Sequence, residues 1–267
     1  MSKLGEANAW AAELVLAAEE TRRRQNEFLA TVVHELRRPL APIRSAASML
    51  GLVDTGDAPA LARLQAIIER QVVQLSRLVD DLLDLSRSHT GKLRLLRSIV
   101  DLRDVVGACI EACRPAVERR RQQLVAVLAA TALEVDADPV RLAQVVGNLL
   151  DNASKFTPDG GAIEVLAALD GGLVVLSVAD NGIGITASAL PRVFEPFAQD
   201  LSRAGSDDSG LGLGLAVVSE LVSAHGGSVV VHSDGAGSGC RFVVSLPLAP
   251  GAPSSRLAAG ERDWAGA

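Results

Sequence analysis

Two apolar seams near the N-terminus constrain the fold of this chain more than any other feature. The residues of the first seam alternate at spacings of four and three, and they are Leu29, Val33, Leu36, Leu40, Ile43, Ala47 and Leu50. The second seam has a similar pattern, in Leu61, Leu64, Ile68, Gln71, Leu75, Leu78, Leu82 and Leu85. Such heptad spacing is typical of helices that pack along one face. Residues 51–59 are rich in Gly, Asp and Pro, which indicates a turn, so we expect an antiparallel α-helical hairpin.

This hairpin needs a partner, because one pair of helices buries too little apolar surface to be stable alone. The second helix also carries apolar residues outside its seam, at Ile67, Val72, Val79 and Leu83. We therefore expect two copies to pair as a four-helix bundle, which makes the protein a homodimer. We assign residues 25–91 to this dimerisation domain. Residues 1–24 contain no helix breaker in their second half and are predicted to be a helical linker that leads into it.

The pattern changes from residue 92 to a mixture of helices and short strands. We expect an α+β two-layer sandwich over residues 92–248 with a mostly antiparallel sheet. Asp138 is placed to cap one helix, and His225 is placed at the end of another. Residues 249–267 are rich in Ala, Gly, Pro and Ser and are predicted to be a disordered tail. The expected helices are 102–121, 139–155 and 213–225, and the expected strands are 124–128, 163–169, 173–179, 228–233 and 240–248.

Composition excludes several functions. The formal charge of −6 argues against a nucleic-acid partner. No stretch approaches the roughly 20 apolar residues that span a bilayer, so we expect no direct membrane span. The three cysteines show no metal-binding spacing and no even number for disulfides, which favours a reducing, cytoplasmic location.

His34 is the first candidate for chemistry. If the first seam points inward, His34 lies beside it on the exposed flank of the helix, held rigidly yet reachable by another domain. Glu35 follows directly, and its carboxylate can accept a hydrogen bond from one imidazole nitrogen and make the other a better nucleophile. A surface His–Glu pair without function is the simpler interpretation of this segment when it is taken alone.

Polar residues in an apolar helix give the second candidate. Asn148 and Asn152 are four residues apart, with Lys155 three further on, so the amides share one helix face. Neutral amide oxygens can complete the coordination of a Mg²⁺ ion that phosphates largely neutralise. Amides are poor choices for the middle of a helix without such a role.

Two glycine-rich segments follow. Asp180 ends a predicted buried strand, where its carboxylate could accept from an exocyclic amine, and Gly182 and Gly184 would let the backbone approach a flat base. Glycines in a segment that opens the last helix could offer amides to phosphate, and they are Gly210, Gly212 and Gly214. Each segment is ambiguous by itself.

In this order over this length, the motifs are specific, and the chain resembles the histidine kinases of two-component systems. The resemblance covers about residues 25–247. The matching segments are the H-box (28–40), the N-box (144–157), the first glycine box (180–185), the F-box (194–199), the second glycine box (210–216) and His225-Gly226-Gly227.

The resemblance implies a GHKL (Bergerat) ATP-binding domain after the dimeric bundle. Asp180 would recognise adenine, Lys155 would face the phosphates, and Asn152 would ligate Mg²⁺ with Asn148 nearby. The glycines at 210, 212 and 214 would edge a flexible ATP lid that Phe194 and Phe197 help to place. His34 would take the γ-phosphoryl group and pass it to an aspartate on the receiver domain of a response regulator.

The chain departs from the family pattern at two places. Arg38 stands where the family usually has Thr or Asn, which puts phosphatase activity in doubt, and Asp207 and Asp208 bring negative charge close to the expected phosphates. No sensor domain is recognisable, so the signal is expected from a separate sensor protein or from a sensor region outside this chain.

Two other functions stay open at this point. One is an ATPase of the gyrase, mismatch-repair or chaperone type, although such enzymes typically have glutamate where this chain has Asn148. The other is a scaffold that holds a response regulator without phosphorylating it.

Overall fold

The structure is a computed structural model that describes residues 3–54, 56–89, 93–198 and 212–251 of the chain. In the first helix, side chains before residue 29 are described only at Glu19, Arg22 and Arg23. The chain forms two compact units, Met1–Asp80 and Asp81–Ala267, and each is considered by itself. None of the described helices is long and apolar enough to cross a membrane.

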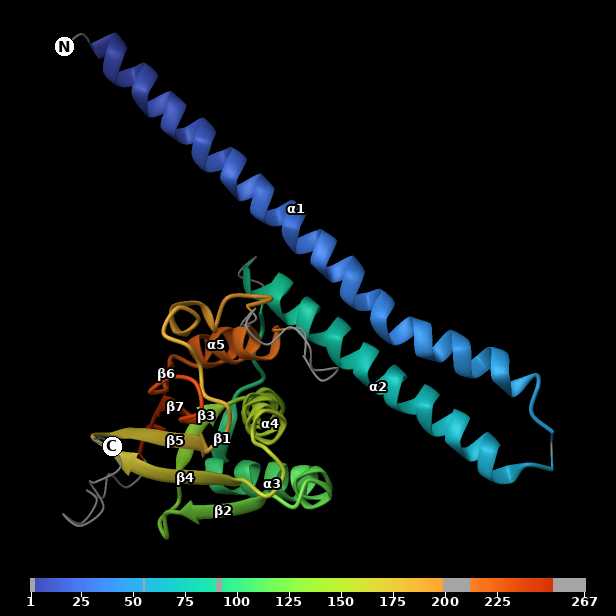
Figure 1. Cartoon of the computed structure of the whole chain (residues 1–267). Helices are drawn as coiled ribbons and strands as arrows, with labels where there is room; N and C mark the ends of the chain where they lie inside the picture. The colour runs from blue at the N-terminus through green and yellow to red at the C-terminus, as the bar shows by residue number, and fades with distance from the viewer. Residues whose placement is uncertain (1–2, 55, 90–92, 199–211, 252–267) are drawn as a thin grey trace. The chain divides into compact units, whose positions relative to one another are not determined.

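The N-terminal unit is the predicted helical hairpin. Helix α1 (Lys3–Leu50) and helix α2 (Ala58–His89) run antiparallel (Figure 1). The turn between them is closed by Asp57, whose side chain accepts from the backbone N–H of Ala60 at 3.0 Å at the start of α2. Residues 90–92, where the predicted dimerisation domain ends, lie outside the described residues.

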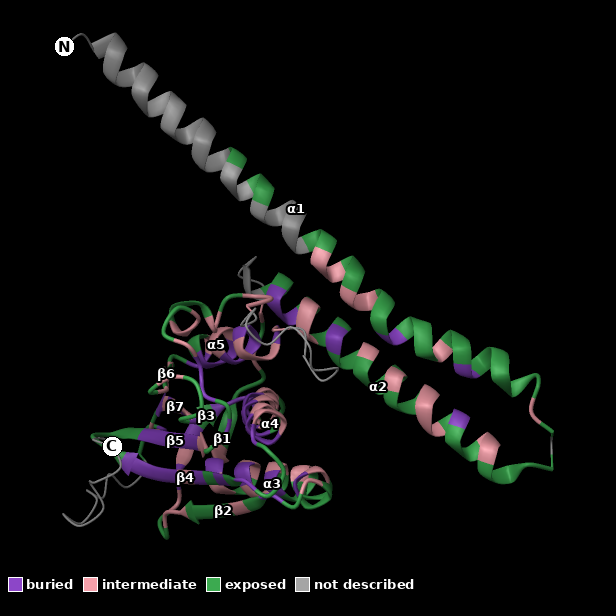
Figure 2. Cartoon of the chain, viewed as in Figure 1, coloured by how far each residue is buried: buried purple, intermediate pink, exposed green. Residues whose placement is uncertain are grey.

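The buried face of α1 is offset from the predicted seam. Pro39 and Ala46 are buried, whereas Leu29, Val33 and Leu40 are about half exposed, as the green patches along α1 in Figure 2 illustrate. The periodicity therefore identified the helix correctly, but most of the first seam is not covered within one chain.

The C-terminal unit is the predicted two-layer sandwich. One layer is a five-stranded sheet of order β2-β4-β5-β7-β6, in which only the β2–β4 pair is parallel. The other layer is formed by three helices that pack on one another and on the sheet, with the core between the layers (Figure 2). The strands are β2 (Gln123–Leu128), β4 (Ala162–Asp170), β5 (Leu173–Asp180), β6 (Ser228–His232) and β7 (Cys240–Pro247), and the helices are α3 (Leu102–Arg119), α4 (Pro139–Phe156) and α5 (Gly214–Ala224).

Two further short strands were not predicted. β1 (Ser98–Asp101) and β3 (Glu134–Ala137) pair antiparallel as a separate small sheet. Ala249, at the start of the predicted tail, is buried and its N–H donates to the carbonyl of Glu134 at 2.8 Å. The rest of that tail, from residue 252, lies outside the described residues.

Local chemistry fixes the start of α4. The Asp138 carboxylate accepts from the backbone N–H groups of Val140 and Arg141 at 3.0 and 3.3 Å, which confirms the predicted N-cap. A proline at the first helical position loses no hydrogen bond there, and Pro139 occupies it. The cap therefore fixes the first turn of α4, and the N-box (144–157) occupies the rest of the helix and ends just after it.

Candidate functional site

His34 lies on the exposed face of α1, with its side chain 76 % exposed. Its Nδ1 is 3.4 Å from Oε1 of Glu35, a long hydrogen bond. The second carboxylate oxygen of Glu35 accepts from Nη1 of Arg38 at 3.2 Å. Glu35 is itself only 12 % exposed, so its carboxylate is held between the imidazole and the guanidinium, while most of the His34 side chain stays open to solvent.

The second half of α4 carries the predicted amide and lysine side chains. Asn148 donates from Nδ2 to the carbonyl of Gly214, at the start of α5, at 3.2 Å. Asn152 lies one turn further along and is half-buried. The Nζ of Lys155 is 4.7 Å from the ring centroid of Phe156, within cation–π range. Lys155 also lies in the last turn, where a cation interacts favourably with the helix dipole.

Asp180 is the last residue of β5, and its carboxylate accepts from the N–H of Gly182 at 2.8 Å. Burial raises its pKa above the ordinary value, and hydrogen bonds from the backbone of Gly182 and Cys240 partly offset that rise. A carboxylate this desolvated is stabilised by any ligand that donates to it. Asp180 is therefore suited to bind an amine or amide hydrogen of a ligand.

The loop after Asp180 requires its glycines. A side chain on Gly182 would collide with the carbonyl oxygen of Phe156, and one on Gly184, which has φ of +68°, would collide with the carbonyl oxygen of Gly235. The N–H of Ile183 donates to the same Phe156 carbonyl at 3.1 Å. This loop is thus seated directly on the C-terminal end of α4.

The second glycine segment meets the F-box. Gly212 has φ of +66°, and a Cβ there would lie 2.7 Å from the carbonyl oxygen of Ala198. Its own carbonyl accepts from the N–H of Phe197 at 3.0 Å, and Phe197 has φ of +61°, an uncommon conformation for a bulky residue. Gly210, Asp207 and Asp208 lie outside the described residues.

Phe194, the other predicted aromatic, packs edge-to-face on Phe242 of β7, with ring centroids 6.4 Å apart. Phe194 is partly buried against the core, so it anchors the start of the F-box to the sheet.

Among the described residues, α4, which carries Asn148, Asn152 and Lys155, is thus bonded directly to the start of α5 and to the glycine loop after Asp180. Sequence reasoning missed the loop between β6 and β7 that supports this arrangement. There the hydroxyl of Ser233 accepts from Ile185 N–H at 2.9 Å, and the N–H of Gly239 donates to the carbonyl of Gly182 at 3.0 Å. The alternating glycines at 235, 237 and 239 were the signal that could have revealed it.

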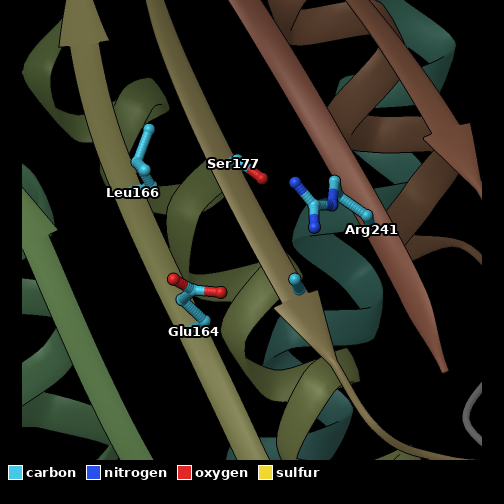
Figure 3. A pocket seen from close by; sticks show the side chains of 5 residues that line it. Glu164, Leu166, Ser177 and Arg241 are labelled. Atoms are coloured by element: carbon cyan, nitrogen blue, oxygen red, sulfur yellow. The ribbon is translucent and has the colours of Figure 1, made fainter. Parts of the chain in front are cut away.

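A shallow hollow lies elsewhere, on the sheet face opposite the helices. Figure 3 shows Glu164 of β4 and Arg241 of β7 on either side of β5, whose small residues Ser177 and Ala179 floor the hollow next to Leu166. Ala179 precedes Asp180, and successive strand residues point to opposite faces. The hollow is therefore separated by the sheet from the predicted site, and we assign it no role.

Among the residues that the structure describes, no three His, Cys, Asp or Glu side chains are grouped as a metal site. Amide oxygens such as those of Asn148 and Asn152 could hold a cation together with ligands from a bound molecule.

Two family models match the chain. Residues 24–91 match the His Kinase A (phospho-acceptor) domain. Residues 137–250 match the histidine kinase-, DNA gyrase B- and HSP90-like ATPase. The fold and the site therefore define a phospho-acceptor hairpin joined to an α+β sandwich of that ATPase class.

Individual proteins narrow the class further. The alginate biosynthesis sensor protein KinB of Pseudomonas aeruginosa is 35 % identical over 229 residues, which are 85 % of this chain and 37 % of KinB. The solved structure of the mycobacterial sensor histidine kinase MprB is 31 % identical, with a TM-score of 0.50 over 58 % of this chain and 99 % of that one. Full-length ShkA, solved in complex with AMPPNP, is 32 % identical, with a TM-score of 0.63 over 86 % of this chain and 47 % of that one.

This chain belongs to the sensor histidine kinases of two-component systems, and it contains their transmitter core. It spans about a third of the length of KinB, 37 %.

Proposed function

We propose that this chain autophosphorylates His34 from ATP and then transfers the phosphoryl group to an aspartate of a response regulator. One observation carries the proposal. The exposed imidazole of His34 is held at one nitrogen by Glu35. The same chain contains helix α4, with Asn148 and Asn152, and the two glycine segments that its family uses to bind ATP. Neither the scaffold function nor a simple ATPase accounts for the His34–Glu35 pair.

In this proposal Asp180 accepts from the exocyclic amine of adenine while Gly182 and Gly184 let the loop approach the base. The structurally similar protein ShkA was solved with the ATP analogue AMPPNP, which supports nucleotide binding by the C-terminal unit of this chain. The second glycine segment (210, 212 and 214) would edge the lid over the phosphates, with Phe194 and Phe197 holding the base of that lid.

Mg²⁺ is compatible with these donors. Because Asn148 uses its Nδ2 to bind Gly214, its Oδ1 is left to face a cation or a water, and Asn152 adds a second neutral amide oxygen. Such neutral ligands suit an ion that phosphates already neutralise. Bound with ATP, Mg²⁺ would offset the charge of the phosphates. Lys155 would contribute a further positive charge at the same end of α4.

The chemical step is a displacement at phosphorus. The Nε2 lone pair of His34 forms the new P–N bond as the bond from the γ-phosphorus to the bridging oxygen breaks and ADP leaves. Glu35 holds Nδ1 and accepts its proton as positive charge develops on the ring. Most of the rate would come from positioning and charge neutralisation.

The second step moves the phosphoryl group to the receiver domain of a response regulator that docks on the helical unit of a homodimer. Arg38 binds Glu35 and, unlike Thr or Asn, has no hydrogen-bond acceptor to orient an attacking water, so we expect weak dephosphorylation of the regulator. We place these reactions in the cytoplasm, with a signal that comes from a separate sensor protein or a sensor region outside this chain.

The test is incubation of the full chain with γ-labelled ATP and Mg²⁺, beside the variants His34→Gln and Glu35→Gln. We expect label that is lost in acid and stable in base on the wild type, none on His34→Gln, and labelling of Glu35→Gln slowed about a hundredfold. Arg38→Gln, which changes the other partner of Glu35, is the matched control and should be labelled within a few-fold of wild type. ATP binding without label on any of these proteins would disprove the autokinase and favour a scaffold.

A further inference from the structure

A glutamine outside every recognised motif clamps the end of α4. Carbonyls in the last turn of a helix have no intrahelical donor and need partners from elsewhere. Here Nε2 of Gln122, in the turn between α3 and β2, donates to the carbonyls of Ser154 and Thr157 at 2.7 and 2.8 Å. Its Oε1 accepts from the hydroxyl of Ser154 at 2.8 Å. The Gln122 side-chain amide thus uses both of its N–H groups and its oxygen on one helix end.

This clamp is buried and specific to that helix end. Gln122 is 7 % exposed and Ser154 is 6 % exposed, so neither can exchange its partner for water at no cost. Arg120 adds an outer layer, with Nη1 donating to the carbonyls of Ser154 and Lys155 and Nε donating to Asp159 at 3.2 Å. Two side chains from one turn therefore bind three carbonyls at the end of α4, those of Ser154, Lys155 and Thr157.

The clamped turn is the one that carries the proposed phosphate and cation ligands. Asn152 and Lys155 flank Ser154 in the sequence, and a shift of the Ser154 backbone would move both of them. The loop proposed to hold adenine (residues 181–185) also rests on this end of α4, through the bond from Ile183 to the Phe156 carbonyl. It has two further supports away from α4, in the bonds from Gly239 to Gly182 and from Ile185 to Ser233. Loss of the clamp should therefore disturb the phosphate end of the site more than the adenine end.

We propose that Gln122, with Arg120 behind it, is a positioning residue that fixes Asn152 and Lys155 against the phosphates of Mg²⁺-bound ATP. This inference rests on the proposed nucleotide-binding function. It extends the reaction's machinery to a turn that none of the sequence motifs includes.

The experiment compares dissociation constants for adenosine and for AMPPNP with Mg²⁺, measured by calorimetry on the full chain and on Gln122→Met. The methionine keeps the volume and removes all three hydrogen bonds. We expect AMPPNP binding to weaken about tenfold, as is usual when a group behind a metal ligand is lost, and adenosine binding to stay within twofold. Ser154→Ala is the matched control, because it removes one bond of the same cluster and leaves both carbonyls clamped. It should lower the unfolding temperature without changing the ratio of the two affinities.

The outcomes separate the two claims. An equal loss of adenosine and AMPPNP affinity in Gln122→Met, or no loss of either, overturns the positioning role and leaves the proposed function intact. A wild-type chain that binds neither ligand overturns the proposed function and this inference with it. If Gln122→Met does not fold, Arg120→Met carries the same test, because it releases the Ser154 and Lys155 carbonyls from the outer layer while Gln122 stays in place.

Discussion

At the scale of single residues, His225 shows how one buried side chain joins several elements. It follows α5, and its Nδ1 is 2.7 Å from the carbonyl of Leu221 in that helix. Its Nε2 accepts from the backbone N–H of Asp138, the N-cap of α4, at 3.0 Å. The two bonds require the neutral tautomer with the proton on Nδ1. Its predicted place at a helix end is confirmed, but its bond to α4 could not be foreseen from its position before two glycines.

This neutral histidine predicts a pH dependence of stability. Burial lowers the pKa of His225 below its usual value, the bond to Leu221 partly offsets this, and Arg97 lowers it further. The unfolded chain takes up a proton near pH 6.5, while the folded chain takes it up only at lower pH. The free energy of unfolding should therefore fall as pH drops below about 6.5, by at most about 1.4 kcal/mol per pH unit, and level off below the folded pKa.

Urea unfolding of wild type and His225→Gln between pH 5 and 8 measures this effect. Glutamine can still donate and accept but does not titrate, so the variant should lose this part of the pH dependence. If the free energy of unfolding changes with pH in the same way for the two proteins across that range, His225 does not cause the pH dependence.

The site residues that were predicted from the sequence share one property: each is a residue type that is unfavourable at its position unless it has a functional or packing role. Asn148 interrupts an apolar helix face, and Gly182 stands where any side chain would collide with α4. Gln122 gave no such signal. It lies among polar residues after a helix, and its partners are 32 and 35 residues away, so only the folded chain reveals its burial.

At the scale of elements, the last turns of α2 are tied to the first turns of α4 within the C-terminal unit. Asp84 is buried, and its carboxylate accepts from Nη1 of Arg141 at 2.6 Å and from Nε2 of Gln144 at 2.9 Å. Leu85 next to it belongs to the core of the same unit. The compact unit accordingly begins at Asp81, inside the second helix.

Breaking this pair should cost far more than removing it whole. Asp84→Leu leaves the partly buried guanidinium of Arg141 without its carboxylate partner. Arg141→Met leaves the buried carboxylate of Asp84 without its positively charged partner. Each single variant should therefore destabilise the unit by about 3 kcal/mol. The double variant removes both charges and should recover most of that loss. A double-mutant cycle from urea unfolding tests this, with Arg114→Met, on an exposed pair with Glu111, as the control expected to change stability by less than about 1 kcal/mol. Additive single effects would contradict the coupling.

The elements that were predicted are those with enough residues to show a period. α4 was expected at 139–155 and spans Pro139–Phe156, because its apolar stripe and its cap agree. β1 and β3 have four residues each, too few for alternation to be visible. Their pairing depends on contacts between segments more than thirty residues apart, which no local pattern records.

At the scale of the whole molecule, the helical unit leaves two stripes of apolar side chains exposed to solvent in a single chain. Leu29, Val33 and Leu40 are 52, 48 and 47 % exposed, and Val72 and Val79 on α2 are 46 and 42 % exposed. Spacings of four and seven place each set on one helix face. Contiguous apolar surface of this kind marks an association site, and each such side chain contributes about 1.5 to 3 kcal/mol when fully buried. The α1 stripe belongs to the first predicted seam, and Val72 and Val79 belong to the apolar residues outside the second seam from which the sequence predicted a four-helix bundle.

We therefore expect the full chain to have twice the 27.8 kDa mass of one copy in solution. The double variant Leu29→Glu with Val72→Glu would bury charge in the predicted bundle and should be a monomer by light scattering, while the helical content of its C-terminal unit is kept. Val125→Glu with Val127→Glu is the matched control, because these valines are 57 and 52 % exposed on the edge strand β2, outside the helical unit. If the helix variant stays a dimer while the β2 variant becomes a monomer, the chain associates through its sheet edge, and the exposed apolar stripes of α1 and α2 have some other partner.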